Sequence, residues 1–248
     1  VCVCVCVCGC ECGCESVKMN SFINQQIELR NLTLNAKKCH QLHIGNPKMH
    51  CPKLNAHKKE VTKVKQDKYL GDVFSFDGKN DYNIKAKISS GVSAISNIMN
   101  IMREICLGKF YFSTAFLLRQ TIFLSTILLN SETWLNLSET NIEELEKIDR
   151  ILIKRIFEAP ATTSSKSLYL ESGCIPIRYI IKARRIMFLH YLLSREKDEL
   201  ISKVLYAQID HPTKNDWYAS VRKDLEDFGL SYLNLEDIKS MKKYKFKK

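Results

Sequence analysis

The fold is decided by residues 84–105, which read IKAKISSGVSAISNIMNIMREI. Apolar residues recur in this segment at steps of three and four, the spacing that places side chains on one face of an α-helix. The segment therefore predicts a long amphipathic helix that starts after Gly78 and ends near Gly108. The positions expected on its buried face are Ile84, Ile88, Val92, Ile95, Ile98 or Met99, Met102 and Ile105.

Helical spacing continues downstream of this segment. Residues 110–129 are almost continuously apolar, but Arg119 and Gln120 interrupt them at the centre, which favours a buried core helix over a membrane span. Thr140 and Glu143 have the spacing of a capping box at the start of the next helix. The further helices are predicted over 142–156 before Pro160, over 177–194 after Pro176, and over 198–209, 216–228 and 235–243.

Residues 17–79 have a different pattern, with short apolar alternations at 41–44 and 61–64. Gly45, Pro47 and Pro52 break these runs, which is typical of short strands and turns. With only 9 glycines and 5 prolines in 248 residues, the predicted fold is mostly α: a helical bundle with a small β-containing N-terminal lead-in. The predicted zones are 1–16, a low-complexity repeat; 17–79, a mixed α/β segment; 80–240, a helical module; and 241–248, a basic tail.

The chain starts with VCVCVCVCGCECGC, which holds seven of its eleven cysteines. A metallothionein-like or zinc-ribbon site is one interpretation, but Cys-x-Cys at every step lacks paired ligands separated by a turn. A repeated GT dinucleotide encodes alternating Val and Cys, so translated microsatellite DNA is the favoured interpretation. We therefore expect residues 1–16 to be disordered. Because position 1 is not Met, we expect the chain to be a fragment or a conceptual translation.

The other four cysteines are scattered through a lysine-rich chain that has no signal peptide. This usage predicts an intracellular, reduced protein, with nucleus and cytoplasm left open. A group of possible zinc ligands contains Cys39, His43, His50 and Cys51, with His40 and His57 nearby. Pro47 and Pro52 interrupt the paired spacing of a zinc knuckle, so surface histidines on a strand pair are the favoured interpretation.

The formal net charge of +11 is concentrated in two segments. Residues 37–68 carry nine lysines against Glu60 and Asp67, a net +7, and residues 239–248 carry six lysines and no acid, a net +6. The rest of the chain sums to −2. Lys63-Val64-Lys65 is expected to place two ammonium groups on one strand face, where they can follow a phosphate backbone without reading bases. Solvated lysines are the alternative.

Motifs of catalysis are missing from the sequence. It contains no Gly-rich phosphate loop, no Gly-x-Ser-x-Gly, no His-Glu-x-x-His and no adjacent pair of aspartates. We therefore predict no catalytic residues and no cofactor for this chain.

Five blocks of sequence resemble, in order, the reverse transcriptases of non-LTR (LINE-type) retrotransposons. The first resembles the strand that closes the palm, and the second resembles the region just past the palm. Together the five blocks span roughly residues 30 to 230. The blocks are Asn35-Ala36-Lys37-Lys38-Cys39; Asp67-Lys68-Tyr69-Leu70-Gly71-Asp72 with Ser75-Phe76-Asp77-Gly78 and residues 83–88; residues 128–134; Leu145, Asp149 and Arg155-Ile156; and residues 173–177 with 182–185.

The resemblance implies a thumb and downstream part of such an enzyme, a helical module that binds the template–primer duplex. RNA or an RNA–DNA duplex is the expected partner, and no membrane is expected. The palm aspartates of the family would precede Cys39, where this chain has its repeat. Mg²⁺ is expected only in an intact polymerase, and we expect no nucleotidyl transfer from this chain. The alternatives are a stand-alone, non-specific nucleic-acid-binding helical protein and a translated relic without activity.

The residues expected to contact nucleic acid come from the lysine-rich segment and from the block after Pro176. They are Lys37, Lys38, Lys58, Lys59, Lys63, Lys65, Lys68, Arg178, Lys182, Arg184 and Arg185.

Overall fold

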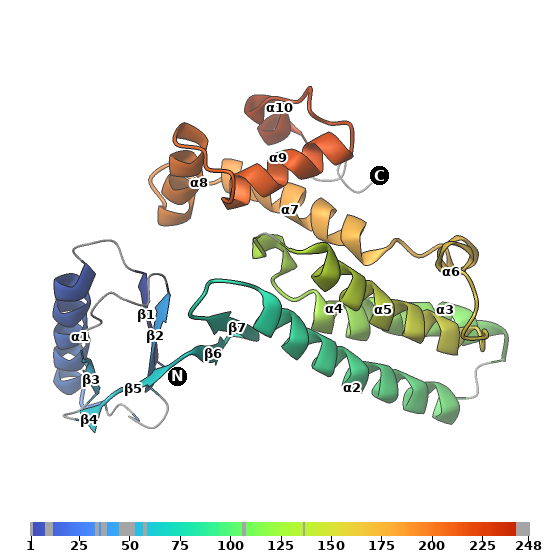
Figure 1. Cartoon of the computed structure of the whole chain (residues 1–248), viewed down its shortest axis with the longest axis horizontal. Coiled ribbons are helices and arrows are strands. Elements are labelled where there is room, and N and C mark those ends of the chain that lie inside the picture. The colour runs from blue at the N-terminus through green and yellow to red at the C-terminus, as the bar shows by residue number, and fades with distance from the viewer. Residues whose placement is uncertain are drawn as a thin grey trace. The chain divides into compact units, whose positions relative to one another are not determined.

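A computed structural model describes the backbone of residues 2–7, 12–32, 35, 39–44, 53–56, 59–105, 108–135 and 137–241 (Figure 1). The chain forms two compact units, Val1–Asn83 and Ile84–Lys248. The described part of the chain is mostly helical, as the sequence predicted, and its strands all belong to the first unit.

The first unit is built on a parallel sheet in which β2 lies between β1 and β5. Helix α1 joins β1 to β2 and lies against β1 (Figure 1). Two separate strand pairs, β3–β4 and β6–β7, are antiparallel. The elements are β1 (Cys2–Val7), α1 (Cys12–Leu29), β2 (Cys39–Ile44), β3 (Asn55–Ala56), β4 (Lys59–Glu60), β5 (Thr62–Val64), β6 (Gln66–Tyr69) and β7 (Asp72–Ser75).

Strand β1 lies within the N-terminal repeat, and α1 begins at Cys12. The alternation itself favours the strand, because β-branched valines at every second position prefer extended backbone. The short apolar runs predicted as strands at 41–44 and 61–64 correspond to β2 and β5.

The second unit is helical. Helix α2 begins in the first unit and continues into the second. Further along the chain, a π-helical turn, η3, joins α3 to α4 without a break. The elements are α2 (Asp81–Ile105), η2 (Gly108–Phe110), α3 (Tyr111–Leu118), η3 (Arg119–Phe123), α4 (Leu124–Ile127), η4 (Ser131–Thr133), α5 (Glu139–Ile156), α6 (Ser165–Ser172), α7 (Ile177–Leu193), α8 (Leu200–Asp210), α9 (Trp217–Asp227) and α10 (Leu235–Ser240).

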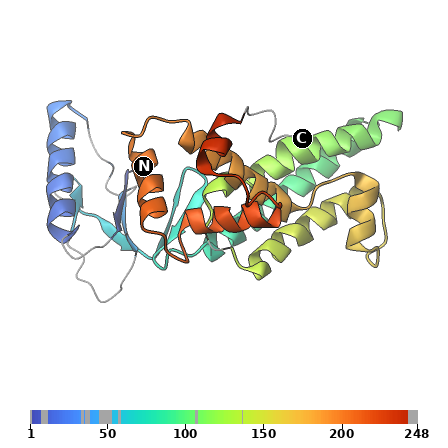
Figure 2. The same ribbon diagram turned by 90° about the horizontal axis from the view of Figure 1, so that it is seen from above.

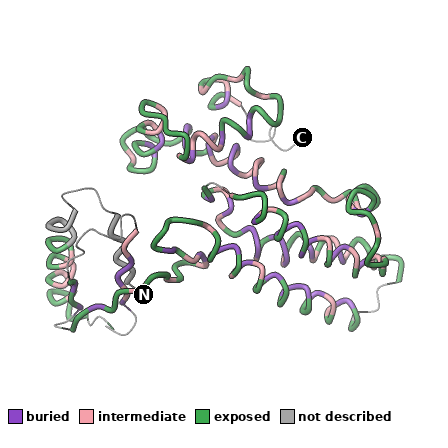
Figure 3. Tube along the Cα trace, in the orientation of Figure 1, coloured by how far each residue is buried: buried purple, intermediate pink, exposed green. Residues whose placement is uncertain are grey.

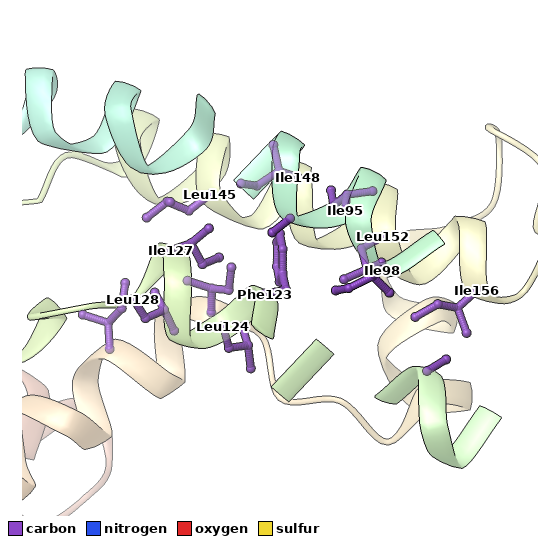
Figure 4. Close-up of a cluster of buried hydrophobic side chains, with 14 of the residues drawn as sticks. Ile95, Ile98, Phe123, Leu124, Ile127, Leu128, Leu145, Ile148, Leu152 and Ile156 are labelled. Atoms are coloured by element: carbon purple, nitrogen blue, oxygen red, sulfur yellow. The ribbon is translucent and has the colours of Figure 1, made fainter. Parts of the chain in front are cut away.

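Two hydrophobic clusters stabilise this unit. The first lies among α2, α4 and α5, with Phe123 and Ile127 between the two longer helices (Figure 4). Buried positions follow α2 and α5 at helical spacing (Figure 3). The second cluster joins α7 to α8, α9 and α10, with α9 lying across α7 in both views of the ribbon (Figures 1 and 2).

Helix α2 approaches its neighbours most closely at Gly91. A Cβ atom built on Gly91 would lie 2.7 Å from Cγ2 of Ile127 and 2.8 Å from Cδ1 of Ile148. Such distances are closer than packed side chains tolerate, so a larger residue at this position would force Ile127 and Ile148 to shift. The prediction that Val92 lies on the buried face was wrong: its side chain is 54% exposed. The apolar spacing allowed either position, and the close helix contact selects Gly91.

Arg119, which argued against a membrane span, is buried beneath α5. Its Nε and Nη2 donate to the two carboxylate oxygens of Asp149, both at 2.7 Å, and Asp149 is fully buried. The hydroxyl of Tyr169, on α6, donates to the same carboxylate at 3.3 Å. Burial raises the pKa of Asp149, and the hydrogen bonds from Arg119 oppose that shift.

Two local expectations need correction. The N-cap of α5 is Ser138, whose Oγ accepts a hydrogen bond from the backbone N–H of Asn141, and not the predicted Thr140–Glu143 pair. A serine cap is equally typical, and the spacing alone did not separate the two. Helices α1 and α6 were not predicted, because their apolar residues lack a regular helical spacing.

The ion pair between Arg119 and Asp149 gives a test of the core. We expect Asp149→Leu or Arg119→Met alone to lower the free energy of unfolding by about 3–5 kcal/mol, because each leaves a buried charge without its partner. The double variant should lose less than either single variant, since two apolar side chains leave no unpaired charge. Urea denaturation of the four proteins measures this. Additive losses would show that the two side chains act independently.

Candidate nucleic-acid interface

Exposed lysines follow the chain from β4 to β6 in the first unit. Lys59 lies on β4, Lys63 on β5 and Lys68 on β6, and all three side chains are exposed. Lys65 is also exposed, but it lies in the bend between β5 and β6. The expectation that Lys63 and Lys65 share one strand face therefore needs correction, because the strand is interrupted at Lys65.

The hairpin of β6 and β7 ends in a two-residue turn at Leu70 and Gly71. Both have positive φ, 48° and 89°, the geometry that matches the twist of a two-residue hairpin. Leucine disfavours this conformation by roughly 1–2 kcal/mol, and the Leu70 side chain is 75% exposed. The hairpin thus holds an apolar side chain at its tip in a strained position.

The strand register separates two kinds of side chain on this hairpin. Tyr69 pairs with Asp72 and Phe74 pairs with Asp67, so the two aromatic residues share one face. Lys68 pairs with Val73 on the opposite face. Both rings are exposed, as is Lys68. The hairpin therefore has one face with a lysine and one with exposed aromatic rings.

Asn83, in the first turn of α2, anchors the hairpin. Its Oδ1 accepts a hydrogen bond from the backbone N–H of Val73 at 3.1 Å, and its Nδ2 donates to Oδ1 of Asp72 at 3.0 Å. Both Asn83 and Asp72 are buried. Asn83 thus fixes the β6–β7 hairpin to the first turn of α2.

Asp77 closes the turn that follows β7. Its Oδ1 accepts hydrogen bonds from Ser75 Oγ at 2.5 Å and from the backbone N–H of Lys79 at 3.1 Å. These hydrogen bonds lower the pKa of Asp77 below its ordinary value of 3.8, and the one from Ser75 has the largest effect. The carboxylate therefore stabilises a turn.

One further contact ties β2 to β6. His40 Nδ1 lies 2.9 Å from Oδ2 of Asp67. His40, predicted as a surface histidine on a strand pair, is partly exposed and lies on β2. The carboxylate of Asp67 is therefore engaged beside the lysines.

The four predicted cations of α7 bind within the second unit. Arg178 pairs with Glu146 on α5 at 2.9 Å, and Lys182 pairs with Asp227 on α9 at 2.5 Å. The other two form their own contacts: Arg185 pairs with Asp224 through two hydrogen bonds of 2.7 and 2.8 Å, and Arg184 donates to the carbonyl oxygen of Leu128. The sequence did not show these partners, which lie 32 to 56 positions away.

The other predicted site residues are only partly described. Lys37, Lys38, Lys58, His50 and Cys51 lie outside the described residues, as do residues 242–248 of the basic tail. Of the possible zinc ligands, Cys39 is buried and His43 is half-buried, both on β2. Across the described residues, no three metal-binding side chains lie close enough together to hold an ion.

Comparisons of the chain with protein-family models, curated proteins and solved structures found no match. Within the described part of the chain, every helix is too short or too polar to cross a lipid bilayer.

Asn83 provides a test of the hairpin anchor. We expect Asn83→Ala to lower the free energy of unfolding of the first unit by about 1–3 kcal/mol, because it leaves the half-buried N–H of Val73 and the buried carboxylate of Asp72 without this partner. Hydrogen exchange of the Val73 amide should accelerate more than that of amides in α1. Unchanged exchange at Val73 would contradict the assigned role.

Asp77 provides a test with a defined pH dependence. Because its folded pKa lies below 3.8, the folded chain binds fewer protons, and the stability that Asp77 contributes is complete above that pH. It is lost as the pH falls further, through the folded pKa. Asp77→Ala should therefore be less stable than the parent at pH 7, and the difference should narrow as the pH falls below 3.8, measured by chemical denaturation. A difference of the same size at every pH would exclude this linkage.

Proposed function

We propose that this chain binds RNA or an RNA–DNA duplex with little sequence preference, using the exposed lysines between residues 59 and 68. The observation that carries the proposal is the exposure of four lysines along one stretch of chain: Lys59 on β4, Lys63 on β5, Lys65 in the bend that follows and Lys68 on β6. We call these four residues the lysine row. Ammonium groups contact phosphates without reading base edges, which accounts for the expected lack of sequence preference.

The charge distribution supports this location. Residues 37–68 have a net charge of +7, whereas the chain outside this segment and residues 239–248 sums to −2. The α7 cations already neutralise carboxylates or bind a carbonyl oxygen in the helical unit. We therefore assign the phosphate contacts to the lysines and give Arg178, Lys182 and Arg185 a structural role.

The resemblance to non-LTR reverse transcriptases gives this binding a context. The Lys68-Tyr69-Leu70-Gly71 block lies at the β6–β7 turn, next to the exposed lysines. In our proposal the chain corresponds to the part of such an enzyme that follows the palm and holds the template–primer duplex. A stand-alone nucleic-acid-binding protein would bind in the same way, whereas a relic without activity would show no binding.

The test is a charge-matched pair of triple variants. Changing Lys63, Lys65 and Lys68 to Gln should weaken binding to an RNA duplex, an RNA–DNA hybrid and unrelated sequences about equally. The slope of log affinity against log salt should fall by roughly two to three units, because a complex with three fewer phosphate contacts releases fewer counterions when it forms. Fluorescence anisotropy between about 50 and 200 mM salt measures both quantities.

The matched control removes three exposed lysines from the helical unit. Changing Lys166, Lys203 and Lys223 to Gln alters the net charge by the same amount and should leave the slope unchanged. Circular dichroism of each variant separates lost binding from lost fold. If both triple variants weaken binding equally, net charge and not this interface attracts the nucleic acid; if neither does, the lysines are a solvated surface.

A further inference from the structure

Arg184 differs from the other three cations of α7. Arg178, Lys182 and Arg185 each lie within ion-pair distance of a carboxylate, whereas Arg184 has none among the described residues. Its Nη1 donates to the carbonyl oxygen of Leu128, at the end of α4, and to Ser131 Oγ at 3.3 Å. Arg184 therefore helps to cap α4, which accounts for one of its three nitrogen atoms.

The other two nitrogens of Arg184 point to an additional role. Within the described part of the chain, neither Nε nor Nη2 has a hydrogen-bond acceptor. The side chain is half-buried, and burial lowers the pKa of the guanidinium. An arginine still keeps its proton at neutral pH. The carboxylate of Glu132 attracts this guanidinium and opposes the effect of burial on its pKa, but among the described residues it forms no ion pair with Arg184.

A hollow of about 470 Å³ opens beside this guanidinium. Arg184, Met187, Phe188 and Tyr191 line it from one face of α7, since they are spaced by three, four and seven residues. Phe188 and Tyr191 stack with their ring centres 5.9 Å apart, which keeps this wall rigid. The volume is within the range that binds small organic molecules.

We propose that this hollow binds a small organic anion, with a phosphate or carboxylate group on Arg184 and an apolar, preferably aromatic, body against Met187 and Phe188. A planar guanidinium presents parallel N–H donors that match the oxygens of either anionic group. Glu132, on η4, also lines the hollow and attracts the guanidinium of Arg184. Its carboxylate opposes an anion and therefore limits the affinity.

The ε-methyl group of Met187 reports on the hollow directly. The probe is phenyl phosphate, added to the full chain labelled with ¹³C at its six methionine methyl groups. The ring of phenyl phosphate should shift the Met187 methyl signal in a saturable way and leave the signals of Met99 and Met102, on α2, unchanged. Benzoate tests a carboxylate in place of the phosphate, whereas inorganic phosphate and phenol each lack one half of the ligand and should bind at least about tenfold more weakly.

Three variants test the electrostatic argument. Arg184→Gln should weaken phenyl phosphate binding at least about tenfold, and Glu132→Gln should tighten it about two- to threefold. Lys182→Gln is the matched control, since Lys182 lies on the same helix, pairs with Asp227 and does not line the hollow. It should leave the affinity unchanged.

The two main variants are expected to act in opposite directions, so the proposal stays testable if Arg184→Gln fails to fold. It would be overturned by a Met187 signal that no aromatic anion shifts, by phenol binding as well as phenyl phosphate, or by Glu132→Gln leaving the affinity unchanged. Because the hollow and the lysine row belong to different units, loss of one binding activity is distinguishable from loss of the other.

Discussion

A buried guanidinium is the constraint on which the helical unit depends. Arg119 lies buried in the middle of a largely apolar helical segment, where an unpaired charge would be strongly destabilising. Asp149, on α5, accepts two hydrogen bonds from Arg119, and Tyr169, on α6, donates a third to the same carboxylate, so both helices are tied to the segment that carries Arg119. The π-helical turn begins at Arg119, and such turns change the direction in which a side chain leaves its helix.

The same reasoning extends to α7, whose cations contact three other parts of the unit. Arg178 reaches α5, Arg184 reaches the end of α4, and Arg185 reaches α9. A row of basic residues on one helix looks, in sequence alone, like a surface for a polyanion. In the structure these side chains instead form contacts between helices. The lysines of the first unit are therefore the better candidates for phosphate contacts.

Local sequence patterns were enough to predict most of the helices. They could not predict contacts between residues far apart in the sequence. The spacing of Ile84, Ile95 and Ile98 was enough to predict α2, because a repeating pattern reports on one helix at a time. Whether Gly91 or Val92 faces the core depends on how closely a neighbouring helix approaches, which spacing does not encode. The partners of the α7 cations are likewise far away in sequence, so the prediction for Arg185 could not distinguish a phosphate from Asp224.

One feature of α7 affects how the helical unit unfolds. Its first half contributes Ile177 and Ile181 to one hydrophobic cluster, and its second half contributes Ile186 and Leu189 to the other. A single continuous helix thus belongs to both cores, and neither core can lose it without exposing apolar surface in the other. The two clusters are therefore one cooperative folding unit, which should melt in a single transition although its hydrophobic interior has two centres.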